Sequence, residues 1–285
     1  MNIYAVLSIL FWSTVASAFK LTLSRIDPVS MLFYSSITST LVFLLVNIIR
    51  KPENWSSIRA NYNSILLGFM NPFFYYLVLF TAYSRLPAQE AQALNYTWPI
   101  MLVLFSSYLL RQPVTLNEVF GILLGFLGIV IIGTRGDLSS LSFKDPVGDG
   151  LALSSAMLFA MYWILNLQDD RRAEVKMFWN FLFGSVYITL YAIGFKGIKL
   201  DPLGILGAVY IGIFEMGVTY LLWLKALEID RAGKVASLIY LTPIISLGII
   251  SLTVGERIMA STVVGLGLIL SGVFLSRRGG GPAGI

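Results

Sequence analysis

The segment Asn95-Tyr96-Thr97-Trp98-Pro99 lies in the middle of an apolar run from Ala88 to Leu110. A run of this length can span a bilayer as an α-helix. Proline lacks an N–H group and clashes with the carbonyl four residues earlier, which here belongs to Asn95. We therefore expect Pro99 to kink a membrane-spanning helix and to leave a carbonyl that needs a partner in protein, water or ligand.

The same pattern occurs a second time, 144 residues further along, where Tyr240 and Pro243 correspond to Tyr96 and Pro99. The match continues without a gap through the neighbouring apolar runs, and it includes the pairs Gly68/Gly212, Tyr76/Tyr220, Ala82/Ala226, Gly121/Gly265 and Gly128/Gly272. Paired Pro, Tyr and Gly residues at one constant offset indicate an internal duplication. Two corresponding helix breaks in a duplicated membrane chain are typical of a transporter.

The composition is that of a polytopic membrane protein. Of the 285 residues, 57% are hydrophobic and only 12% are charged, and the mean hydropathy is +0.80; soluble domains carry roughly 25% charged residues. The net charge of +5 is not gathered into a basic stripe, so we expect no nucleic-acid partner. Cysteine and histidine are both absent, and there is no Walker A motif. We therefore expect neither an enzyme nor an ATP-driven pump, and no metal or other cofactor.

Ten apolar runs are long enough to be membrane spans, five in each half of the chain. Their approximate bounds are Ile3–Phe19, Val29–Ile49, Ile65–Ser84, Ala88–Leu110, Val119–Thr134, Gly150–Gln168, Met177–Phe195, Leu203–Leu224, Ala232–Val254 and Ala260–Ser276. Because five is odd, the second repeat must be inverted relative to the first. The predicted fold is thus an all-α polytopic membrane protein of two inverted five-helix repeats, residues 1–136 and 137–278, with a disordered tail at 279–285.

The distribution of lysine and arginine predicts the orientation in the membrane. If the N-terminus is cytoplasmic, 12 of the 20 Lys and Arg residues fall on the cytoplasmic side and 8 on the other. Since positive residues favour the cytoplasmic side, we expect both termini in the cytoplasm.

Glu215 is the candidate site residue with the most specific signal, because it lies in the middle of the eighth apolar run. A carboxylate at that depth costs ~2.5–3.5 kcal/mol on insertion scales. It must face a cavity, pair with another group or be protonated, and a purely structural hydrogen bond between helices is the alternative. Its repeat equivalent, Asn71, is also polar and precedes Pro72.

Aromatic and amide side chains near the helix breaks are the further candidates for substrate binding, since rings and amides suit an organic zwitterion or cation. Packing and interface belts are the other interpretation of such rings. The candidates are Trp12, Tyr75, Asn95, Tyr96, Trp98, Trp163, Tyr220 and Tyr240. Lys20 and Glu90, near the ends of their runs, could form an outer gate or extend to the interface.

The two halves resemble EamA domains of the drug/metabolite transporter superfamily. The matching pieces are Phe11-Trp12-Ser13 with Lys20, Leu94 to Pro99, the glycines 121, 125 and 128, Tyr240-Leu241-Thr242-Pro243, and Gly255-Glu256-Arg257. Within the superfamily, the Asn-Tyr-x-Trp-Pro and Tyr-x-Thr-Pro segments look most like YddG-type amino-acid exporters. The resemblance implies a ten-span exporter in the bacterial inner membrane, a monomer or weak dimer in the lipid bilayer.

Three functions are compatible with these observations. The first is a secondary exporter of amino acids or similar small metabolites, either driven by an ion gradient, with protons as the candidate ion, or facilitative without coupling. The second is a transporter of nucleotide sugars or lipid-linked groups, which needs a larger and more basic cavity. The third is a membrane scaffold or receptor that transports nothing.

Overall fold

The computed structural model describes residues 2–58, 61–86, 91, 94–134, 136–137, 145–242, 245–246, 249 and 260–278. All regular structure in these residues is helical, which confirms the predicted all-α class. The first repeat contains α1 (Ile3–Trp12), α2 (Val15–Leu23), α3 (Pro28–Arg50), α4 (Ser64–Gly68), η2 (Phe69–Phe74), α5 (Tyr75–Arg85), α7 (Trp98–Leu109) and α8 (Leu116–Gly133). The second contains α9 (Pro146–Leu167), α10 (Ala173–Tyr191), η4 (Ala192–Lys196), α11 (Pro202–Tyr210), η5 (Ile211–Val218), α12 (Thr219–Ile229), α13 (Ala232–Ile239) and α15 (Ala260–Arg278).

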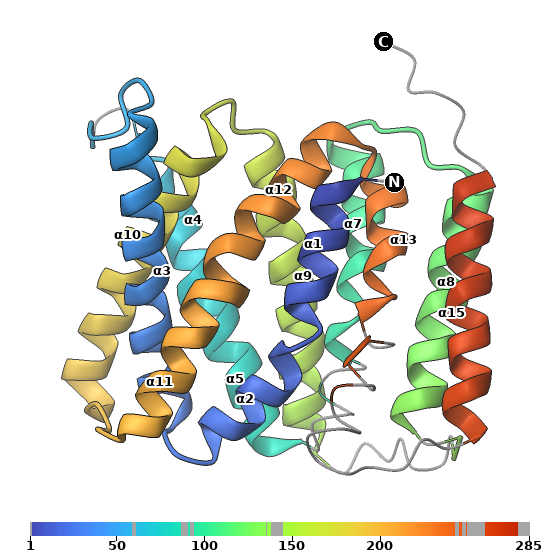
Figure 1. The fold of residues 1–285 in the computed structure, drawn as a ribbon, viewed down its shortest axis with the longest axis horizontal. Helices are drawn as coiled ribbons and strands as arrows, with labels where there is room; N and C mark the ends of the chain where they lie inside the picture. The colour runs from blue at the N-terminus through green and yellow to red at the C-terminus, as the bar shows by residue number, and fades with distance from the viewer. Residues whose placement is uncertain are drawn as a thin grey trace.

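The helices stand roughly parallel to one axis and run alternately up and down (Figure 1). Equivalent helices of the two repeats run in opposite directions. For example, α1 starts at the upper face of Figure 1 and α9 starts at the lower face, while α8 runs down and α15 runs up. The repeats are therefore inverted. We call the upper face, where α1 begins and α15 ends, the N-terminal face.

The outer surface of the bundle is apolar, as contact with lipid requires. Within the described ranges, six helical segments are long and apolar enough to cross a membrane, and further apolar helices are shorter. Large apolar side chains point outwards around the bundle, with Leu21, Ile49 and Leu190 each more than 60% exposed. In water, so large an apolar surface would be unfavourable. The chain is thus built to sit in a bilayer.

Several spans are interrupted near their middle, and this positions the site. The first span breaks at Ser13 and Thr14, where the Ser13 hydroxyl donates hydrogen bonds to the carbonyls of Ile9 (2.6 Å) and Thr242 (3.2 Å). The third span breaks at Asn71, which is extended, and the eighth continues through the π-helix η5. Irregular backbone at membrane depth is tolerated where protein or a cavity surrounds it.

Pro99 does not kink a continuous helix. The fourth span is interrupted by a turn at Tyr96 and Thr97, and α7 begins at Trp98, so Pro99 lies in the first helical turn. Proline is favoured there because its missing N–H would have no helical partner. Pro243, Glu90 and the predicted tail at 279–285 lie outside the described residues.

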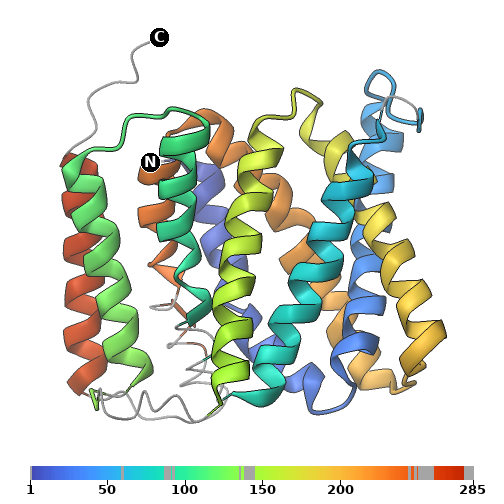
Figure 2. The ribbon, with the colours of Figure 1, turned by 180° about the vertical axis from the view of Figure 1, so that it is seen from behind.

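Helices α8 and α15 lie side by side at one edge of the bundle in both views (Figures 1 and 2). Their backbones approach closely at glycines: a Cβ atom on Gly272 would lie 2.4 Å from the Gly121 carbonyl oxygen, and one on Gly128 would lie 2.6 Å from that of Gly265. Small residues permit such contacts in lipid, where no hydrophobic force draws helices together.

We predict that Gly272→Ala lowers the stability of the purified protein by ~1–3 kcal/mol, because the new methyl group overpacks this contact. Thermal unfolding in detergent measures the effect. Gly267→Ala on the same helix is the control, since a Cβ there meets nothing within 4 Å. Equal melting temperatures for the two variants would contradict the close approach of α8 and α15.

Candidate substrate-binding site

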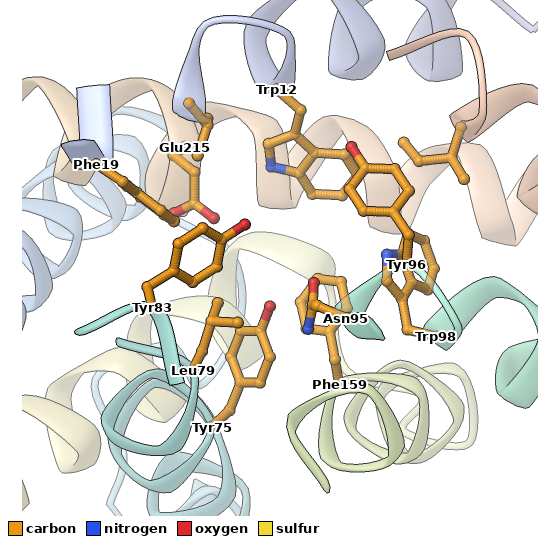
Figure 3. A pocket seen from close by; sticks show the side chains of 12 residues that line it. Trp12, Phe19, Tyr75, Leu79, Tyr83, Asn95, Tyr96, Trp98, Phe159 and Glu215 are labelled. Atoms are coloured by element: carbon orange, nitrogen blue, oxygen red, sulfur yellow. The ribbon is translucent and has the colours of Figure 1, made fainter. Parts of the chain in front are cut away.

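A cavity lies between the two repeats, beside the broken spans. Its volume is about 70 Å³, which is room for roughly five water molecules at ~10–15 Å³ each. The lining residues come mostly from the first repeat: Trp12, Val15, Phe19, Tyr75, Leu79, Tyr83, Asn95, Tyr96, Trp98, Phe159, Glu215 and Ile239. Figure 3 shows the hydroxyls of Tyr75 and Tyr83 and the amide of Asn95 directed into the space between the rings, with the Glu215 carboxylate at its edge.

Glu215 is the only charged side chain among the described residues that line this cavity. Only 6% of the surface of this residue is exposed. One carboxylate oxygen, Oε1, accepts a hydrogen bond of 2.6 Å from the Tyr76 hydroxyl. The other, Oε2, is buried and has no hydrogen-bond partner. A carboxylate in this setting requires a proton or a cationic group at Oε2, because an unpaired buried charge is very costly.

Glu215 belongs to a hydrogen-bond network that follows the repeat symmetry. The hydroxyls of Tyr76 and Tyr220, which are repeat equivalents, lie 2.9 Å apart. Tyr76 donates to Glu215, and Tyr220 accepts a 3.1 Å hydrogen bond from the amide of Asn71, the repeat equivalent of Glu215. The local symmetry axis therefore passes between the two tyrosines, with a carboxylate on one side and an amide on the other.

A layer of packed rings separates the cavity from the N-terminal face. Trp223 lies with its ring centroid 5.1 Å from that of Trp12 and 5.5 Å from that of Trp98. Behind Phe159, the rings of Trp163 and Tyr220 are 5.0 Å apart, and both residues are fully buried. Aromatic contacts of this kind pack tightly, so the layer closes the cavity on that side.

Above this layer, polar contacts tie the helices together at the N-terminal face. Lys176 is 2% exposed and donates hydrogen bonds to the carbonyls of Asn166 (2.6 Å) and Asp169 (2.7 Å). Arg231 forms a 2.8 Å ion pair with Glu118, which is 1% exposed. These contacts join α9 to α10 and α8 to the start of α13.

At the opposite face, the ion pair between α5 and α9 is exposed. Arg85 donates two hydrogen bonds to Asp145, of 2.8 and 2.9 Å, and these lower the pKa of the Asp145 carboxyl. Exposed ion pairs contribute little to stability. The described part of the chain is therefore tied more strongly at the N-terminal face than at the opposite face.

A model of the EamA-like transporter family matches residues 1–134 and again residues 146–278. The chain belongs to the EamA-like transporter family. It is thus a membrane transporter and not an enzyme. The two matched segments correspond to the two inverted halves of the fold.

Individual relatives are distant. An uncharacterized transporter of Archaeoglobus fulgidus is 23% identical over 285 residues, covering 95% of this chain and 96% of the relative. An aromatic amino acid exporter, YddG of Ancylobacter novellus, is 23% identical over 242 residues, covering 84% and 83%. One crystal structure, at 22% sequence identity, superimposes with a TM-score of 0.85 over 97% of each chain, which shows a shared fold.

The candidate residues of this EamA-like transporter fall into two groups. Those that line the cavity are Trp12, Tyr75, Asn95, Tyr96, Trp98 and Glu215. Those that lie behind its wall, fully buried, are Asn71, Trp163, Tyr220 and Tyr240. Lys20 is exposed near the end of α2, and its predicted pairing with Glu90 falls outside the described residues.

Sequence reasoning missed part of the cavity wall: Val15, Phe19, Leu79, Tyr83, Phe159 and Ile239. One signal could have revealed two of them. Tyr75, Leu79 and Tyr83 recur every four residues and therefore share one face of α5.

Proposed function

We propose that this transporter exports amino acids or related small amine-bearing metabolites by alternating access, with residues 1–136 and 137–278 as the two moving units. The observation that carries the proposal is the free Oε2 atom of Glu215 in a cavity walled by aromatic rings. An ammonium group satisfies this oxygen electrostatically, and the surrounding rings attract the same group through cation–π contact.

Coupling to protons follows from the same carboxylate. Glu215 holds either a proton or the ammonium group of the substrate, because its Tyr76-bound oxygen leaves only Oε2 available. Mutually exclusive occupation links export of the substrate to movement of a proton in the opposite direction. The amino acid exporter among the relatives supports this substrate class.

The cavity gives less support to nucleotide sugars or lipid-linked groups. Its described lining contains no lysine or arginine, whereas phosphate groups are usually bound by such side chains. A small aromatic cavity with one carboxylate favours a small amine over a phosphorylated sugar.

We predict that Glu215→Gln folds but loses gradient-driven transport, because the amide keeps the shape of the side chain and cannot carry a proton or pair with an ammonium group. Proton-driven flux of L-tryptophan in sealed vesicles tests this, with Glu53→Gln, an exposed loop carboxylate, as the control. Full, pH-dependent flux through folded Glu215→Gln would refute the proposed role.

We also propose that the protein lies in the bacterial inner membrane with the N-terminal face in the cytoplasm. The chain has no native cysteine, so single cysteines can report the orientation. We predict that a membrane-impermeant maleimide added to intact cells labels Ser24→Cys, exposed at the opposite face, and spares Ser56→Cys, exposed at the N-terminal face. The reverse pattern would overturn this orientation.

A further inference from the structure

Three buried hydrogen-bond donors on the closed side of the cavity, towards the N-terminal face, have no hydrogen-bond partner among the described residues. They are the indole Nε1 atoms of Trp163 and Trp223 and the hydroxyl oxygen of Thr242. All three residues are at most 1% exposed. Since buried polar groups are nearly always hydrogen-bonded, three unpaired donors on one side of the cavity require an explanation.

The repeat relation connects these residues to the cavity. At the offset of 144, Trp163 corresponds to Phe19, Trp223 to Leu79 and Thr242 to Trp98, and all three first-repeat residues line the cavity. The remaining first-repeat lining residues follow the same rule. Their equivalents are either buried on the closed side, as are Ala156, Thr219, Leu227 and Tyr240, or line the cavity themselves, as do Phe159 and Ile239.

This pattern is what two inverted repeats produce when only one of two exchangeable conformations is present. If the repeats exchange conformations, the buried equivalents become the lining of a cavity that opens to the N-terminal face. The three unpaired atoms would then meet water or substrate. A residue needed only for packing could be a phenylalanine, as Phe19 is, without the cost of an unpaired indole N–H.

We propose that Trp163, Trp223 and Thr242 form a latent binding surface that faces the N-terminal side in the opposite state and binds the carboxylate of the substrate. The proposal rests on the proposed transport of amino acids. Two indole N–H groups and a hydroxyl are hydrogen-bond donors, and hydrogen bonds to a charged acceptor are the stronger kind. Glu215 binds the ammonium group, so the two charged ends of an amino acid are recognised by different repeat-related surfaces.

Cysteine labelling tests the latent surface without knowledge of the substrate. In lipid nanodiscs, a polar maleimide should modify Thr242→Cys at least ~10-fold faster than Ser246→Cys, because the first position opens transiently in a minor state. Ser246 is the matched control: it lies four residues further along the chain, is 3% exposed, and corresponds to Leu102, which does not line the cavity. Equal labelling rates would overturn the proposal.

A substrate pair tests the ligand chemistry. L-Tryptophan and tryptamine differ only in the carboxylate, so Trp223→Phe should lower tryptophan flux in vesicles ~10-fold or more and leave tryptamine flux unchanged. Trp179→Phe is the control, because its indole donates to the Trp55 carbonyl at 2.7 Å, away from the cavity. Equal losses for both compounds, or no loss, would refute carboxylate binding. If the unmodified protein moves neither compound, the proposed substrate class is wrong, and the Thr242 labelling still decides whether the latent surface exists.

Discussion

The constraint on which this structure depends is one buried carboxylate at the centre of a membrane protein. Glu215 cannot be solvated by lipid, and the described residues provide only one hydrogen bond to its carboxylate, from Tyr76. The surrounding architecture follows from this need. The Tyr76 hydroxyl is hydrogen-bonded to that of Tyr220, which in turn accepts a hydrogen bond from Asn71. Asn71 and Glu215 lie in the irregular helical segments η2 and η5. The polar network is thus built where the backbone already departs from a regular helix.

The network also explains why the two halves are alike in sequence but not in chemistry. Its tyrosines are identical in the two repeats, which keeps the local symmetry axis, whereas Asn71 and Glu215 differ. In the proposed mechanism, one carboxylate at the axis gives the cavity a single site for a proton or an ammonium group. Two would repel each other, and none would leave an aromatic cavity with no charge to select its ligand.

Most of the fold could be predicted from the sequence because lipid imposes simple rules. Long apolar runs and the 144-residue offset predicted the helices and their inversion, and a charge at mid-membrane depth identified Glu215. The details of the breaks could not be predicted. The break at Ser13 and Thr14 involves a tertiary hydrogen bond from Ser13 to the Thr242 carbonyl. The irregular segment η5 contains no proline from which it could have been predicted. The sequence predicts a break in the segment that contains Pro99. A turn at Tyr96 and Thr97 precedes the proline, so Pro99 lies in the first turn of α7 and does not kink a continuous helix. Which rings line the cavity, such as Phe19 and Tyr83, and which lie behind it, such as Trp163, depends on how the two repeats pack together and not on composition.

In the proposed mechanism, one carboxylate at the symmetry axis, in either repeat, binds the amine. Exchanging the two axis residues tests it, by combining Asn71→Glu with Glu215→Asn, with Glu215→Asn alone as the reference. The measurement is calorimetric binding of tryptamine to each purified protein. We predict that Glu215→Asn alone loses binding. The exchanged protein should recover it in the opposite state, where position 71 faces the cavity and Tyr220 can donate to the relocated carboxylate as Tyr76 does to Glu215. An exchanged protein that folds and binds tryptamine no better than Glu215→Asn alone would contradict this role of the carboxylate.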